Sequence, residues 1–295
     1  MKLRTSVLDH GYVEFIEDWG VGRAGVPEAG IIEAARQSTQ ASFRSWAPYE
    51  LCEICGGWRL TTDSHDGVRD LGELLHSLRG DTSVMYGDPT CEHRFKQFPR
   101  GDEGLLSFLF NSKPQHGSVF EFAGLVIEIQ APIFVFREWM RHRTASYNEM
   151  SARYAPLPPF DYVPDAKNLV ARADVARTTK NRQAAGVAGD DVILTPDMAE
   201  EDLALLRQHY AETEQLYQRF LSRGWPKEMA RVPMPVGRYS RMRASANLRN
   251  WLAFLTLRSD PAAQWEIRQF ADVVGKIISW RMPRTWRLFD LARAA

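Results

Sequence analysis

The sequence predicts a single α+β domain spanning residues 1–295. Three observations support this class. Residues 1–20 and 119–130 are rich in β-branched and aromatic side chains, the C-terminal third carries apolar residues at helical spacing, and the chain contains neither an internal repeat nor a clean linker. Strands in one half and helices in the other are typical of an α+β domain.

The N-terminal third contains few regular elements. Residues 1–20 predict one or two strands, and a short helix is expected at residues 30–36. Residues 40–100 are rich in Gly, Asp, Cys, Trp and Pro, which predicts an irregular insertion around one amphipathic helix near residues 69–79. A further helix is expected at residues 104–111, before Pro114.

The rest of the chain is more regular. A strand is expected at residues 119–130, followed by a helix that Pro132 begins and that continues through residues 133–140. Residues 155–196 contain four prolines in their first part and predict a long, mobile excursion. The remaining elements are expected to be helices: one of about 25 residues capped by Asp197 and ended by Gly224, a short one from Trp225, and two at 245–258 and 262–281.

Composition and charge exclude several classes of protein. The chain is 44% hydrophobic and 25% charged, which is ordinary for a globular domain. Its 37 basic and 37 acidic residues cancel, which argues against a general nucleic-acid or membrane partner. No apolar run reaches the roughly 18 residues of a membrane span, and the N-terminus lacks the apolar stretch of a signal peptide. We therefore expect a cytoplasmic protein.

The three cysteines do not suggest a disulfide framework. Cys52 and Cys55, together with Cys91 and His93, supply the four ligands of a possible zinc site. The 35 residues between the two halves make this a loose match. Buried or unreactive thiols are the alternative.

Residues 141–154 point most directly to function. Arg141, His142, Arg143 and Arg153 follow an apolar run, and no packing rule requires such a density of positive charge. A doubly anionic ligand does require it, because guanidinium groups bind phosphate oxygens in pairs. Residues 231–258 add six arginines without one acidic residue, which favours an anion pocket over a solvated face.

Four elements resemble those of one enzyme family. Arg141, His142 and Arg143, followed by seven residues and Ser151, are similar to the RHRx7S signature of flavin-dependent thymidylate synthases, the ThyX family. Residues 116–121, 231–235 and 247–267 resemble three further elements of that family, in the same order. The resemblance covers most of the chain apart from the 40–100 insertion.

The resemblance implies a fold, an assembly and a reaction. The fold is α+β with a central antiparallel sheet flanked by helices, and the assembly is a homotetramer with active sites shared between subunits. FAD is the implied cofactor. The implied reaction transfers a methylene group from methylenetetrahydrofolate to C5 of a uridylate (dUMP or UMP), with NADPH as reductant.

The resemblance also implies roles for individual residues. Arg258 is the catalytic residue that stabilises negative charge on the uracil; the alternative is that it only ends a helix. The implied substrate contacts are Glu138, Arg141, Glu149, Ser151, Ala152, Arg153, Arg231 and Arg258, with Arg231 coming from a neighbouring subunit. The implied flavin contacts are Ser118, Glu121, Arg141, His142, Arg143, Glu149, Asn247, Arg249 and Leu257. His116 is expected near the folate and nicotinamide face, unless it is an ordinary surface histidine.

Three positions depart from the family pattern. Family members usually have Gln at Glu138, Asn at Ala253 and His at Ala262. A carboxylate accepts hydrogen bonds only, so Glu138 suits a ribose 2′-hydroxyl, as in the UMP- and dUMP-methylating branch of the PolB type. The alternatives are that Glu138 pairs with Arg137 or Arg141, that the enzyme acts on dUMP only, or that the protein binds nucleotide or flavin without turnover.

Overall fold

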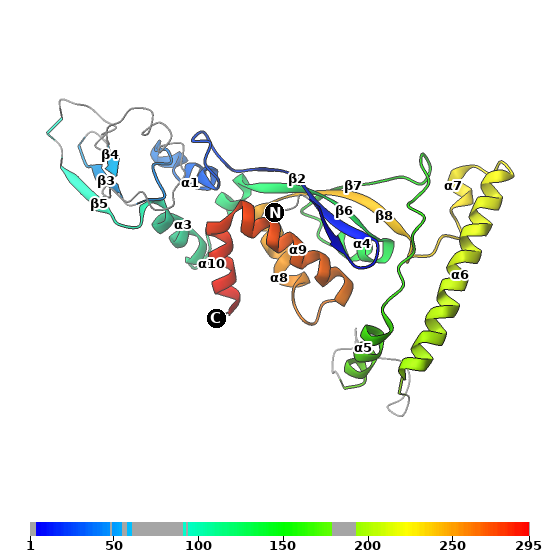
Figure 1. The fold of residues 1–295 in the computed structure, drawn as a ribbon. Coiled ribbons are helices and arrows are strands. Elements are labelled where there is room, and N and C mark those ends of the chain that lie inside the picture. The colour runs from blue at the N-terminus through cyan, green and yellow to red at the C-terminus, as the bar shows by residue number, and fades with distance from the viewer. Residues whose placement is uncertain are drawn as a thin grey trace. The chain divides into compact units, whose positions relative to one another are not determined.

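The computed structural model describes residues 4–47, 49–54, 58–60, 91–92, 94–178 and 193–294 (Figure 1). Its internal contacts divide the chain into two compact units. The first unit comprises Met1–Ile16, Val126–Ser245 and Ala253–Gly275, and the second unit comprises Glu17–Leu125, Ala246–Leu252 and Lys276–Ala295.

Five strands form the larger sheet, in the order β1-β2-β6-β8-β7. Their bounds are β1 Arg4–Val7, β2 Gly11–Trp19, β6 Gly124–Pro132, β8 Tyr239–Asn247 and β7 Ser146–Glu149. β1 pairs with β2 and β7 pairs with β8, both antiparallel, with Arg4 opposite Glu14 and Ser146 opposite Ser245. The expected combination of helices with an antiparallel sheet is confirmed.

In the first unit, one face of the sheet packs on an aromatic core. Ile127, Ile129 and Ala131 alternate along β6 and are fully buried. The Trp139 ring, at the end of α4 (Ile133–Trp139), stacks on Phe254 of α8 (Leu248–Arg258) with centroids 4.8 Å apart. Phe270 of α9 (Trp265–Arg281) meets the edge of the same indole. This core fixes the end of α4 against α8.

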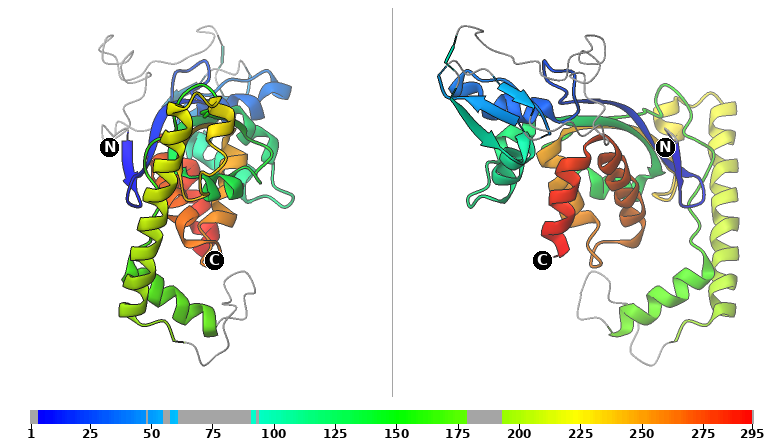
Figure 2. Two further views of the ribbon diagram at one scale, coloured as in Figure 1. Left: turned by 90° about the vertical axis from the view of Figure 1, so that its right-hand side faces the viewer. Right: turned by 60° about the vertical axis from the view of Figure 1, so that its left-hand side comes forward.

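Three helices follow β7 in the first unit. They are α5 (Ala166–Thr178), α6 (Pro196–Ser222) and α7 (Lys227–Ala230). Figure 2 shows α5 against one end of α6 and α7 against the other. The 155–196 stretch, expected to be an excursion, therefore contains a helix, and Arg172 of α5 forms an ion pair with the buried Glu266 of α9.

Among its described residues, the second unit contains a small sheet and several helical elements. The strands β4 (Trp58–Leu60), β3 (Tyr49–Cys52) and β5 (Phe95–Phe98) pair antiparallel in that order. The helical elements with long-range contacts here are α1 (Ala29–Ala35), α3 (Gly101–Asn111), the 3₁₀ helix η2 (Gly117–Phe122) and α10 (Pro283–Ala294). A second 3₁₀ helix, η1 (Gln37–Thr39), follows α1. The 40–100 stretch is therefore less irregular than expected, and residues 69–79 lie outside the described part.

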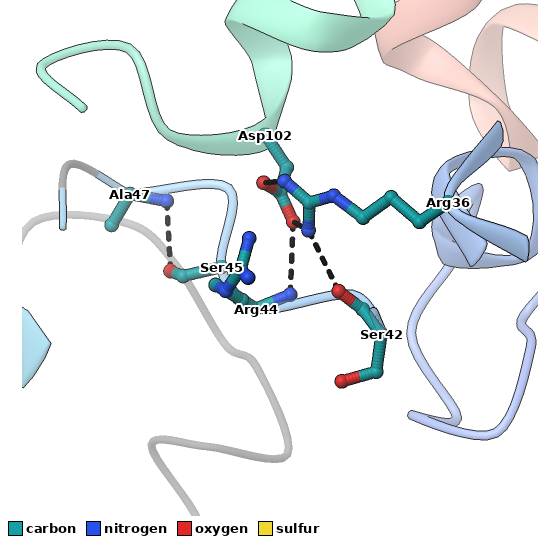
Figure 3. A network of polar contacts seen from close by, with 6 residues as sticks. All are labelled: Arg36, Ser42, Arg44, Ser45, Ala47 and Asp102. Atoms are coloured by element: carbon teal, nitrogen blue, oxygen red, sulfur yellow. Dashed lines mark hydrogen bonds and ion pairs between the residues drawn. The ribbon is translucent and has the colours of Figure 1, made fainter. Parts of the chain in front are cut away.

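A buried carboxylate organises the start of α3 (Figure 3). Asp102 has no exposed surface and accepts hydrogen bonds from both terminal nitrogens of Arg36, at 3.0 and 2.6 Å. It also accepts from the backbone N–H of Arg44, and Arg36 donates to the carbonyl of Ser42. This network holds the loop after α1 against α3.

Several element boundaries differ from those expected. Residues 119–122 belong to η2, and the strand begins only at Gly124, where a Cβ would collide with the Trp19 ring. Residues 245–247, expected to begin a helix, instead end β8. This strand was not predicted. Thr195, not Asp197, caps α6, since its hydroxyl accepts from the N–H of Met198 at 3.2 Å. β7 and α10 were also missed.

Within the described residues, no helix is long and apolar enough to cross a bilayer. No cluster of three His, Cys, Asp or Glu side chains suited to a metal ion occurs in the described ranges. Cys55 and His93 lie outside those ranges, so the zinc alternative, which the loose spacing disfavours, is not tested there.

Candidate functional site

The signature residues form a turn between α4 and β7. Met140 ends α4, and His142 closes the turn by donating its N–H to the carbonyl of Trp139 at 3.0 Å. The Tyr147 hydroxyl lies 3.1 Å from the carbonyl of Trp139 and 2.9 Å from that of His142. Burial raises the pKa of Tyr147 to about 12, so this hydroxyl remains a donor. Tyr147, not expected as a site residue, thus shapes the turn that carries Arg141 and Arg143.

Arg258, the last residue of α8, reaches across to this turn. Its Nη1 donates to Oε2 of Glu138 at 3.0 Å, and its Nη2 donates to the backbone carbonyl of Glu138 at 3.3 Å. Its Nε donates to Nε2 of His142 at 2.9 Å. The structure therefore brings together three residues that the sequence analysis assigned to the site, from positions 116 and 120 residues apart.

Burial and the contact with Arg258 together determine the charge of His142. Burial, and then the nearby guanidinium, lower the pKa of His142 to about 4. The ring also meets the edge of Phe254 at 4.9 Å. His142 is consequently neutral at physiological pH, with Nε2 as acceptor and the proton on Nδ1.

Glu138 has one engaged oxygen and one available oxygen. The expected alternative, pairing with Arg137 or Arg141, is wrong, because the partner is Arg258 on another helix. Oε1 of Glu138 makes no hydrogen bond within the part of the chain that the structure describes. The carboxylate can therefore hold Arg258 and still accept one further donor.

The end of the signature presents donors on one short segment. Ser151 Oγ accepts from the backbone N–H of Arg153 at 3.3 Å and from its Nε at 3.4 Å, so the two side chains lie together. Ala152 between them is buried. The Lys227 ammonium donates to the carbonyl of Tyr154 at 3.0 Å, which ties this segment to α7. Arg231 follows α7 and is exposed.

The second unit holds another group of predicted residues. Arg249 donates to Oε1 of Glu121 at 2.6 Å, and both side chains are about half exposed, at 56% and 42%. A Cβ on Gly117 would lie 3.1 Å from Nε of Arg249, so the glycine permits this close approach. Asn247 accepts from the N–H of Asn250 at 3.0 Å and caps α8.

His116 and Ser118 flank Gly117, the residue that lies against Arg249. Both are exposed, and the His116 ring lies 5.8 Å from the ring of Phe108, which is 60% exposed. An exposed histidine and an exposed phenylalanine form a surface suited to a planar ligand. The place of His116 at the folate and nicotinamide face stays a prediction.

The donor chemistry fits a phosphate-bearing cofactor and substrate. Arg141, Arg143, Arg153 and Arg231 are exposed and form no ion pair with any described residue. Unpaired guanidinium groups with nearby hydroxyl donors are what the phosphates of FAD and of a nucleotide require.

The remaining predicted residues are placed less decisively. Glu149 lies in β7 opposite Met242, and Leu257 is 60% exposed on α8. Ala253 and Ala262, two of the departures from the family pattern, are exposed in the first unit. Their exposure leaves room for a ligand.

Comparison with known proteins gives a consistent result. Residues 59–284 match the family of the thymidylate synthase complementing protein, Thy1. The chain is 37% identical over 207 residues to a flavin-dependent thymidylate synthase of Thermus thermophilus, which covers 70% of this chain and 68% of that protein. It is 34% identical over 216 residues to the enzyme of the same name from Anaplasma marginale, covering 73% and 70%.

Two solved structures are also similar. Both are of the UMP/dUMP methylase PolB from Streptomyces cacaoi. The form bound with 5-bromo-UMP is 33% identical with a TM-score of 0.55, covering 63% of this chain and 82% of that chain. The form bound with 5-bromo-dUMP is 26% identical with a TM-score of 0.61, covering 97% of each.

Proposed function

Because this chain belongs to the thymidylate synthase complementing protein family, we propose that it is an FAD-dependent enzyme that methylates C5 of uridine 5′-monophosphates. The family indicated by the Arg141–Arg143 signature is confirmed, and with it the expectation of an enzyme. The carbon donor that we propose is methylenetetrahydrofolate, and NADPH is the proposed reductant of the flavin.

The arrangement around Arg258 is the observation that carries this proposal. Three N–H groups of its guanidinium are engaged by Glu138 and His142. An arginine has five N–H donors, which leaves one on each terminal nitrogen. Two donors held in place by a preformed network suit an oxygen atom on which negative charge develops.

The chemistry needs such a donor pair. C5 of uracil is a poor nucleophile until negative charge builds on the ring. No cysteine falls within the matching elements, so a thiolate attack at C6 is not the route for this chain. Arg258 instead stabilises the enolate-like form of the ring. Flavin, when bound, supplies the hydride that completes the methyl group.

We further propose that Arg153, Ser151 and Arg231 bind the nucleotide phosphate. Ser151 and Arg153 present their donors side by side. Arg231 comes from a neighbouring subunit of a homotetramer in this proposal. The exposed apolar residues Leu205 and Leu216 of α6, and Met229 of α7, support an assembly, because it would cover them. A cytoplasmic location stays a prediction.

For the sugar, we propose that the enzyme accepts both UMP and dUMP. Oε1 of Glu138 makes no hydrogen bond among the described residues, so it can accept one from a ribose 2′-hydroxyl. The similar PolB structures contain either 5-bromo-UMP or 5-bromo-dUMP. An enzyme restricted to dUMP is the second candidate.

Tritium release from C5-labelled dUMP and UMP tests the proposal. The purified holoenzyme with methylenetetrahydrofolate and NADPH should release tritium from both nucleotides. Release from dUMP alone identifies a dUMP-specific thymidylate synthase. A yellow, flavin-containing protein that releases tritium from neither nucleotide identifies a binding protein without turnover and rejects the proposal.

A further inference from the structure

The partner of Arg258 is the carboxylate of Glu138, which lies on another helix. We propose that Glu138 sets the acidity of the bound uracil, by partly offsetting the positive charge that Arg258 presents to N3 and its neighbouring oxygens. This inference rests on the proposed function, since it requires a uridylate beside Arg258. It assigns the charge of Glu138 an electrostatic role at the uracil, beside that of its ion-pair partner Arg258.

The ion pair is sheltered enough for its charge to matter. Oε2 of Glu138 lies 3.0 Å from Nη1 of Arg258, and the two side chains are 34% and 20% exposed. Solvent screens such a partly buried pair less than a surface pair. A paired guanidinium therefore stabilises a neighbouring anion less than an unpaired one.

Charge and position can be separated at this residue. The backbone carbonyl of Glu138 accepts from Nη2 of Arg258 at 3.3 Å, and His142 accepts from Nε at 2.9 Å. Neither contact depends on the side chain of residue 138. In Glu138→Gln, the amide oxygen can still accept from Nη1, so the guanidinium stays in place while the negative charge is removed.

The neighbouring titratable groups keep their charge states. His142, in direct contact with Arg258, has a pKa lowered to about 4 by burial and by that guanidinium. Tyr147, behind the turn, has a pKa raised to about 12 by burial. Arg137 and Arg141 flank Glu138 in the chain. A ¹⁵N label at N3 separates the titration of the uracil from those of the nucleotide phosphate, the flavin and the protein.

The experiment follows N3 directly. dUMP labelled with ¹⁵N at N3 is bound to the FAD-loaded protein, and the ¹⁵N shift is recorded against pH. Removing the offsetting carboxylate should lower the pH at which bound N3 loses its proton by about one unit in Glu138→Gln. The matched control is Glu128→Gln, which removes one carboxylate that contacts Tyr12 and Arg243 instead of Arg258; it should leave the N3 titration unchanged.

The Arg258→Ala variant measures the opposite charge of the pair. It should raise the pH at which bound N3 loses its proton, whereas Glu138→Gln lowers it, because the guanidinium stabilises the N3 anion and the carboxylate opposes it. An unchanged or higher N3 titration in the single Glu138→Gln variant overturns the inference. Failure of wild-type protein to bind dUMP overturns the proposed function as well, so the two failures are distinguishable.

Discussion

Nε of Arg258 donates to Nε2 of His142 over 2.9 Å, and this contact fixes the tautomer of the histidine. A ring nitrogen that accepts a hydrogen bond carries no proton, so the proton of the neutral ring is on Nδ1. Arg258, the proposed catalytic residue, and the central histidine of the signature are thus directly hydrogen-bonded. His142 offers Nδ1–H as a donor, and Arg258 retains one N–H on each terminal nitrogen beyond those donated to Glu138.

The Arg258→Ala variant should lose methylation while keeping its flavin. Removing a preorganised charge contact lowers kcat by about 100- to 1,000-fold, whereas the proposed flavin contacts Arg141, Arg143 and Arg249 remain in the variant. Tritium release and the 450 nm flavin absorbance measure the two properties. A variant that retains most of its kcat contradicts the catalytic role. Arg243→Ala, an exposed arginine on β8, is the matched control.

The Arg153→Ala variant should raise KM for the nucleotide with little change in kcat. The loss of one charge-assisted contact to phosphate costs about 1.5–3 kcal/mol, or roughly ten- to a hundredfold in KM. Steady-state kinetics with dUMP measure this. Uridine, which lacks the phosphate, should be a very poor substrate of the wild type. Equal rates for uridine and its monophosphate would show that no anion pocket exists.

Glu138→Gln should lower kcat/KM for UMP more than for dUMP. An amide can orient only one acceptor, and Nη1 of Arg258 competes for it. A 2′-hydroxyl left without a partner costs about 1–3 kcal/mol. The UMP/dUMP ratio isolates this effect, because any change at the uracil is common to both nucleotides. A UMP/dUMP ratio of kcat/KM equal to that of the wild type would show that Glu138 does not contact the sugar.

The folded protein should lose stability as the pH falls from neutral toward pH 4. His142 binds its proton with a pKa of about 4 when folded, against about 6.5 in an unfolded chain. The unfolded state therefore binds more protons in this window, and the free energy of unfolding decreases as the pH falls. Urea midpoints between pH 7 and pH 4.5 test this, and His142→Gln should show a weaker pH dependence. NMR titration of His142 near pH 6.5 would contradict the assignment.

Asp102→Asn should destabilise the second unit strongly. Asp102 is fully buried and pairs with Arg36, and breaking a buried pair costs about 3–5 kcal/mol. The neighbouring Glu103 on the same helix pairs with Arg284 and the exposed Arg287. Glu103→Gln, the matched control, should change the free energy of unfolding by no more than about 1 kcal/mol. Urea denaturation of both variants measures the difference, and equal effects would contradict the organising role of Asp102.

Some of the fold could be predicted from local pattern. The helix α6 is long, amphipathic and bounded by Thr195 and Gly224, so its sequence carries both periodicity and end signals. β8 was missed although the exposed Arg241 and Arg243 alternate with buried residues, because Ala244 and Ala246 at two of its buried positions favour a strand only weakly. β7 lies inside the signature, where chemistry rather than periodicity sets the residue types.

The sequence by itself determined the family and the residues of the candidate site, because spaced motifs such as Arg141 to Ser151 are read without knowing the fold. It could not determine which partners those residues choose. Glu138 was expected to meet a sugar or to pair with Arg137 or Arg141; its ion-pair partner is Arg258, 120 positions away, and the sugar contact stays a prediction. That choice depends on the packing of α4 against α8 through Trp139 and Phe254. Such a contact is long-range, and only the tertiary structure brings the two helices together.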